Sequence, residues 1–161
     1  MRRWILLVLA ILVLAALNGL AAHKESVLRS GTKMYLRLAP VDPRSLMQGD
    51  YMALRYEIAN RVRDLKEELP SDGRLVVRPD AAGVAQFVRL HQGEPLAPGE
   101  HLLRYRNRGG VRLGAESFFF QEGHAKYYEK ARYGELRVAG SGESVLAGLV
   151  GERFERLGPP R

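Results

Sequence analysis

Ser45, Asp50 and Tyr51 carry the side chains with the most evident chemical use in this sequence. They place a hydroxyl, a carboxylate and a phenol close together in VDPRSLMQGDYMALRYEI, residues 41–58. A serine becomes a nucleophile only beside a base, and in a Ser–Lys pair the lysine must be desolvated so that its pKa falls. All five lysines stand among polar neighbours in the sequence: Lys24, Lys33, Lys66, Lys126 and Lys130. We therefore predict no catalytic residues and expect that the protein is not an enzyme.

Ligands for a metal ion or a cofactor are also sparse. The chain has no cysteine, and its four histidines are far apart in sequence with no His-x-x-x-His pair. Two glycine-rich stretches, residues 107–114 and 139–144, lack both the GxGxxG order and a Gly-Lys-Ser/Thr ending, so they are interpreted as hairpin turns. We expect no metal site and no cofactor.

The stretch GDYMALRY, residues 49–56, has the alternating pattern of a half-buried β-strand. Leu54 and Tyr56 share one face and are predicted to enter the core, with the Tyr56 hydroxyl at its edge. Gly49 suits a tight strand entry with positive φ, and Asp50 can accept hydrogen bonds from amides of the preceding turn. The favoured interpretation of the stretch is structural.

The opposite face of this strand carries Tyr51 and Arg55. Tyr51 is the residue of the stretch that packing explains least. If the stretch is a recognition site instead, we expect Asp50, Tyr51 and Arg55 to form it, with Asp42 in the adjoining turn.

A second candidate surface is FFFQEGHAKYYEKARY, residues 118–133, in which aromatic and basic side chains are interleaved. If it is exposed, it is a docking face for a membrane or a partner protein, with Tyr127, Tyr128, Arg132 and Tyr133 as its contacts. Alternatively, residues 118–120 fill the core while the tyrosines pack at its rim. We favour core packing, because buried aromatic side chains are commoner than exposed functional patches.

The N-terminus has the pattern of a membrane anchor. Arg2 and Arg3 precede 19 uncharged residues, Trp4 to Ala22, and a helix of that length spans roughly 28 Å, close to the hydrocarbon core of a bilayer. The arginines predict a cytoplasmic N-terminus and a single span of the inner membrane, with the rest of the chain periplasmic. A cleaved signal peptide with Gly19-Leu20-Ala21 at its cleavage site is the alternative, disfavoured because the apolar run is long.

The rest of the chain divides into a short polar stalk, residues 23–33, and one domain, residues 34–161. Alternation predicts a strand at 34–38, and hydrophobic residues at helical spacing predict a helix at 58–69 that ends at Pro70. Hairpins are predicted at 74–90, 101–114 and 135–150, a strand at 116–123, and one or two helical turns at 124–133 capped by Gly134. The fold class expected is a compact, mainly antiparallel β domain with one or two short helices, behind a transmembrane helix.

The exported part is basic. Removing Arg2 and Arg3 from the 25 basic residues leaves 23 against 18 acidic ones, a net charge of +5. Outside the cytoplasm such a charge favours attraction to anionic lipid headgroups or simple solubility. We expect no nucleic-acid partner.

Gly49, Asp50, Tyr51, Leu54 and Tyr56 match the motif that names the GDYXXLXY family of bacterial membrane-anchored proteins. The flanking PVDPRSLMQ, Glu25 after the anchor and GHAKYYEKARYGELRV, residues 123–138, also resemble that family. The resemblance covers nearly the whole chain. It implies an exported accessory protein, of a kind often encoded beside multi-pass membrane proteins, and it brings no biochemical activity.

RSLMQGDYMAL, residues 44–54, is similar in layout to a segment of type I signal peptidases, which are also membrane-anchored β-rich proteins. Their nucleophilic serine lies eight residues before the glycine of Gly-Asp, where this chain has Val41, and Ser45 stands where they have threonine. The resemblance therefore implies a scaffold similar to that of these peptidases, without their catalytic Ser–Lys pair.

Two functions are expected from these observations. The leading one is a non-enzymatic accessory domain, tethered to the membrane and partnered with a multi-pass membrane protein. The alternative is a signal-peptidase-like envelope enzyme, or a binder of envelope peptides or lipids, that uses a cleft over the motif strand.

Overall fold

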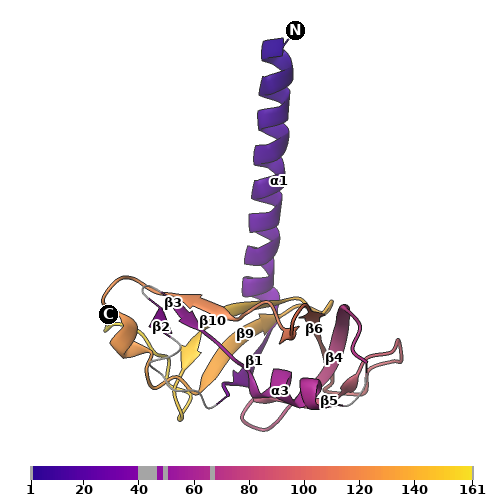
Figure 1. Ribbon diagram of the computed structural model, residues 1–161, viewed down its shortest axis with the longest axis vertical. Helices are drawn as coiled ribbons and strands as arrows, with labels where there is room; N and C mark the ends of the chain where they lie inside the picture. The colour runs from indigo at the N-terminus through magenta and orange to yellow at the C-terminus, as the bar shows by residue number, and fades with distance from the viewer. Residues whose placement is uncertain (1, 40–46, 49–50, 66–67, 161) are drawn as a thin grey trace.

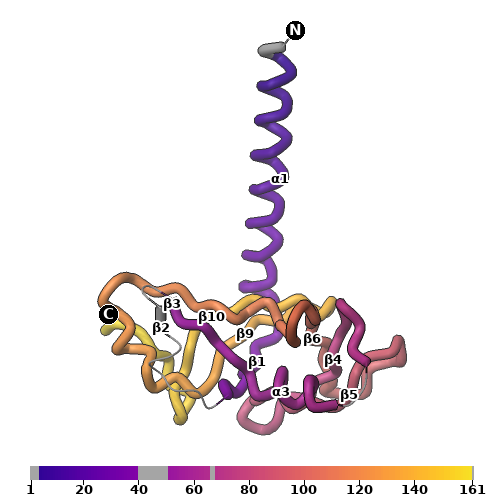
Figure 2. Tube along the Cα trace, in the orientation of Figure 1, coloured from indigo at the N-terminus to yellow at the C-terminus, as the bar shows by residue number. Residues whose placement is uncertain are grey.

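The computed structural model describes residues 2–39, 47–48, 51–65 and 68–160. A long helix, α1 (Arg2–Ser30), stands on a flattened β domain that contains the rest of the described chain (Figure 1). The Cα trace shows that the domain lies at the C-terminal end of this helix and extends to both sides of it (Figure 2).

Helix α1 is long and apolar enough to span a membrane from Trp4 onward, and none of its most apolar window is buried against the domain. Its uncharged run from Trp4 to Ala22 fits either a signal anchor or a signal sequence. The helix continues past Ala22 to Ser30, so most of the predicted stalk is helical.

The domain is built from short antiparallel strands, and the predicted fold class is confirmed. One sheet has the order β1-β9-β10, a second β2-β3-β8, and a third β5-β4-β6-β7. The strands are β1 Thr32–Arg37, β2 Met47–Gln48, β3 Tyr51–Ala53, β4 Asp72–Pro79, β5 Ala85–Leu90, β6 His101–Asn107, β7 Val111–Arg112, β8 Ser117–Phe119, β9 Tyr133–Val138 and β10 Ser144–Val150.

All three predicted hairpins are present, as β4–β5, β6–β7 and β9–β10. The β4–β5 turn contains residues whose own side chains and backbone favour a hairpin. The Asp80 carboxylate accepts hydrogen bonds from the backbone N–H of Ala82 (2.9 Å) and Val84 (3.0 Å), and Gly83 has φ of 80°. An aspartate that holds its own turn and a glycine with positive φ are common hairpin signals.

The helices in the structure are shorter than those that the sequence predicts. Helix α3 (Glu57–Asp64) buries Ile58 and Val62 as its spacing predicted, but it ends at Asp64, well before Pro70. Leu65 has an extended backbone and turns away to pack on the core, which stops the helix earlier than the sequence pattern suggested.

The segment before β9 has one short 3₁₀ helix, η1 (Ala125–Tyr127), and Gly134 lies inside β9 instead of capping a helix. A Cβ on Gly134 would lie 3.1 Å from the Tyr56 hydroxyl oxygen. Gly134 therefore allows β9 to pack closely against the motif segment, residues 51–56.

Most buried side chains form one core cluster that joins the three sheets and α3. The alternation in β1 separates Met34 and Leu36, which enter this cluster fully buried, from Tyr35, which faces a second cluster with Val84 and Tyr133. Strand β1 pairs with β9, about 100 residues later in the chain, so the N-terminal strand is held in place by the C-terminal hairpin.

The same hairpin holds the base of α1. His23 Nε2 lies 2.7 Å from Glu143 Oε2, and Lys24 Nζ donates to Glu143 Oε1 at 2.5 Å. Glu143 lies in the turn between β9 and β10, and Val27, one helical turn later in α1, is buried. The domain is therefore fixed to the helix directly after the apolar run ends.

Replacing Glu143 by glutamine is expected to weaken this junction by about 0.5–1 kcal/mol, a modest effect because the helix partners are half exposed. The Lys24 amine and, next, His23 lower the pKa of Glu143 from 4.5 to about 2. A depressed pKa contributes stability above pH 4.5, and the contribution is lost as pH falls toward 2.

Unfolding of the full chain in detergent micelles between pH 7 and pH 2 checks this prediction. The difference in unfolding free energy between wild type and Glu143→Gln should shrink over that window. Glu152→Gln, at an exposed position, is the control and should follow wild type throughout. A constant difference would contradict the assigned role of the Glu143 charge.

Candidate functional site

The motif segment is the centre of the smallest sheet. Strand β3 pairs on one side with β2, through Gln48 opposite Tyr51, and on the other side with β8, through Tyr51 opposite Phe119. Gly49, Asp50, Asp42 and Ser45 lie outside the described residues. The described motif residues are Tyr51, Leu54 and Tyr56.

The inward face of the segment is core, as the alternation predicted. Met52, Leu54 and Tyr56 are each 2% exposed. The Tyr56 hydroxyl donates a buried hydrogen bond of 2.6 Å to the backbone carbonyl of Ala115. The prediction that this hydroxyl lies at the edge of the core was wrong, because the chain before β8 covers it.

Burial, together with the nearby Glu116 carboxylate, raises the pKa of Tyr56 far above its ordinary value. The phenol therefore stays protonated and acts as a hydrogen-bond donor inside the core. This hydrogen bond joins the motif segment to the chain that precedes β8.

The outward face carries an aromatic pair. The rings of Tyr51 and Phe119 lie 5.7 Å apart in a tilted arrangement, and Phe119 is 75% exposed. Phe118 and Phe120 instead pack against the buried Tyr128, with ring centroids 4.9 and 5.5 Å away. The expectation that residues 118–120 all fill the core was thus wrong for Phe119, which strand alternation turns outward.

The other tyrosines of the aromatic-basic stretch are used mainly in packing. Tyr128 and Tyr133 are 8% and 7% exposed, and Tyr133 stacks on Phe154 at 4.9 Å. Tyr127 is half-buried beside His124, while Arg132 is exposed. The structure does not bring these four residues together with the motif as one surface.

A pocket of about 560 Å³ lies directly beside the motif segment. Tyr51, Leu54, Arg55 and Tyr56 contribute to it, and so do residues of α3, β8 and the β6–β7 hairpin. Its charged lining residues are Arg55, Arg63, Arg112 and Glu116. Sequence reasoning found Tyr51 and Arg55 but missed the other three charged residues, because no local signal places α3 and β7 against the motif.

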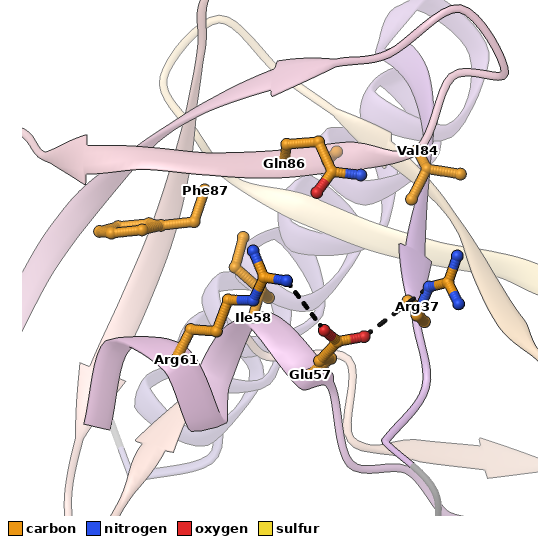
Figure 3. Close-up of a pocket in the computed structure, with 8 residues that line it drawn as sticks. Arg37, Glu57, Ile58, Arg61, Val84, Gln86 and Phe87 are labelled. Carbon is orange, nitrogen blue, oxygen red and sulfur yellow. Dashed lines mark hydrogen bonds and ion pairs between the residues drawn. The ribbon is translucent and has the colours of Figure 1, made fainter. Parts of the chain in front are cut away.

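A second pocket, of about 280 Å³, lies between β1, α3 and β5 (Figure 3). Its charged side chains form ion pairs. Arg61 Nη2 is 3.1 Å and Arg37 Nε is 3.7 Å from the Glu57 carboxylate, as the dashed lines show. Both arginines therefore pair with the one carboxylate that lines this pocket.

A sequence model of the GDYXXLXY protein family matches residues 13–149, which include the motif and most of the β domain. The chain belongs to the GDYXXLXY family. No curated protein and no solved structure gives a match.

The charged side chains beside the GDYXXLXY motif are mainly those of arginine. All lysines within the described residues are exposed, and Ser45 and Lys66 lie outside those residues. In the same described ranges, no three His, Asp or Glu side chains gather closely enough to bind a metal ion. Arginine side chains around a pocket bind carboxylate or phosphate groups in a bidentate manner.

Proposed function

We propose that this GDYXXLXY protein is a non-enzymatic interaction domain, anchored by α1 on the periplasmic side of the inner membrane. Its partner is a multi-pass membrane protein, and its contact surface is the outward face of β3 and β8, with Tyr51 and Phe119 at the centre. The observation that carries the proposal is the aromatic pair formed by the half-buried Tyr51 of β3 and the exposed Phe119 of β8.

The position of this face supports a partner in the same membrane. Strand β3, and the orange segment that runs beside it, lie on the side of the domain from which α1 rises (Figures 1 and 2). An exposed phenylalanine next to a tyrosine is costly to leave in water and typical of the anchor residues that dominate protein interfaces. The contacts of Glu143 with His23 and Lys24 hold the β9–β10 turn against the base of α1, which supports a position of this face near the membrane.

Site-specific photo-crosslinking in membranes tests the proposal. A photoreactive phenylalanine analogue at position 119 of the full chain should form an adduct with a membrane protein, and the adduct should decrease several-fold when Tyr51 is also changed to alanine. The same analogue at Val88, which is 40% exposed on β5, is the matched control and should give no protein adduct. Adducts with lipid alone, or equal protein adducts at both positions, would contradict the proposal.

The pocket beside the motif supports a second candidate function, a binder of anionic envelope peptides or lipids. Arg55, Arg63 and Arg112 come from three different segments and line one space of about 560 Å³. The same experiment separates the two functions. Specific adducts from the analogue at position 55, with none from position 119, would favour the binder over the interaction domain.

A further inference from the structure

The base of α1 lies at a defined height in the bilayer if the helix spans it. The apolar run ends at Ala22, and Lys24 comes two residues later, about 3 Å along the helix axis. The headgroup layer extends roughly 5–8 Å beyond the hydrocarbon core on each side. The Lys24–Glu143 contact therefore places the β9–β10 turn within the headgroup layer.

A pocket of about 390 Å³ opens at this level. Lys24 of α1 and Glu143 of the turn both line it. Strand β6 is held beside the turn, because the Arg104 backbone N–H donates to the Gly142 carbonyl at 2.7 Å. The basic residues that line this headgroup pocket are Lys24, Arg104, Arg106, Arg108 and Arg112.

The acidic groups around the headgroup pocket are already engaged. Glu143 is bonded to Lys24 and to His23 of α1. Glu116 accepts hydrogen bonds from the backbone N–H groups of Leu113 and Gly114. These contacts occupy both carboxylates that line the pocket.

Asp72, next to the pocket, is shared between two arginines. Its Oδ1 lies 3.9 Å from Arg104 Nη2 and 3.6 Å from Arg106 Nε. Within the described part of the chain, neither Arg108 nor Arg112 forms an ion pair with a carboxylate. The five basic side chains thus face three acidic ones, and positive charge remains at Arg108 and Arg112.

We propose that the headgroup pocket binds the phosphate of an anionic phospholipid from the membrane that α1 spans. Arg108 and Arg112 supply the contacts, since guanidinium groups bind phosphate oxygens in a bidentate manner. Bound lipid holds the domain flat on the bilayer and so presents the β3–β8 face to its surroundings. The inference rests on the membrane anchor of the proposed function but not on a protein partner.

Lipid titration of the full chain in detergent, read by native mass spectrometry, tests this inference. The probes are phosphatidylglycerol, phosphatidylcholine and soluble glycerol 3-phosphate. The variant is Arg108→Gln with Arg112→Gln. The matched control is Arg61→Gln with Arg153→Gln, which removes the same charge from two exposed residues outside the headgroup pocket.

We expect wild type and the control pair to retain phosphatidylglycerol in preference to phosphatidylcholine. The Arg108/Arg112 pair should bind phosphatidylglycerol roughly 30-fold more weakly, about fivefold for each basic residue lost near a membrane surface. Unchanged unfolding of this pair would show that folding is intact, as expected for two exposed side chains.

Three outcomes would overturn the inference: equal retention of the two lipids, equal loss in both variant pairs, or binding of glycerol 3-phosphate as tight as that of the lipid. None of them depends on the adduct at position 119. Failure of this inference is therefore distinguishable from failure of the proposed protein contact.

Discussion

Tyr56→Ala is expected to destabilise the β domain by about 3–5 kcal/mol, the usual cost of removing a buried aromatic ring from a core. Tyr56 is one of the largest fully buried side chains, and it packs against Gly134 of β9 while its backbone pairs with Leu38. Its loss opens a cavity where the motif segment meets the β1-β9-β10 sheet. For a domain whose total stability is of order 5–15 kcal/mol, this is a large fraction.

Tyr56→Phe measures the contribution of the hydroxyl to stability separately from that of the ring. It keeps the packing but leaves the Ala115 carbonyl without its 2.6 Å hydrogen bond inside the core, which costs about 1–3 kcal/mol. Denaturant unfolding of the full chain in micelles, followed by circular dichroism, measures both variants. Tyr51→Ala is the control on the same segment and should cost less than about 1 kcal/mol, because Tyr51 lies on the outward face. Equal losses at positions 51 and 56 would contradict the division of the motif into two faces.

That division follows from the sequence alone. A period of two places Leu54 and Tyr56 on one side and Tyr51 on the other, and the structure has this arrangement. The same local patterns predict the three hairpins, because Asp80, Gly83 and their equivalents act within their own turns. Local periodicity and turn chemistry are therefore sufficient wherever the interacting residues are close in sequence.

What the sequence does not predict depends on contacts between distant segments. Strand β3 pairs with β8, more than 60 residues later, and this pairing brings the chain before β8 over the Tyr56 hydroxyl. This cover has no local signal in the sequence, whereas the outward position of Phe119 follows from strand alternation. The arginines that line the headgroup pocket and the pocket beside the motif also come from several segments of the chain. Their grouping therefore has no local signal in the sequence.

The early end of α3 shows a competition between local and tertiary effects. The spacing of Ile58, Val62, Leu65 and Leu69 fits one helix to Pro70, yet the chain leaves the helix after Asp64. Leu65, which has an extended backbone, and Leu69 still pack on the core. The helical spacing in this charged segment therefore predicted the buried residues correctly. It predicted a helix that is longer than the one in the structure.

Gly31→Ala is the second change for which we expect a large effect, because Gly31 joins α1 to β1 and has no room for a side chain. A Cβ there would lie 2.5 Å from the Val27 carbonyl oxygen and 3.0 Å from the Val138 backbone nitrogen. Both are backbone atoms, which cannot move aside as a flexible side chain can. We expect a cost of about 1–3 kcal/mol, typical of overpacking, and a changed angle between helix and domain.

Limited trypsin digestion of the full chain in proteoliposomes measures this change. Arg29 and Lys33 flank the junction, so cleavage there should be several-fold faster in Gly31→Ala than in wild type. Gly19→Ala is the matched control in the same helix, because a Cβ at position 19 would meet no atom within 4 Å. The height of the headgroup pocket depends on this junction as much as on the Glu143 contacts. If Gly31→Ala left both proteolysis and stability unchanged, the domain would not be held rigidly by α1, and neither the lipid pocket nor the β3–β8 face would have a fixed position at the membrane.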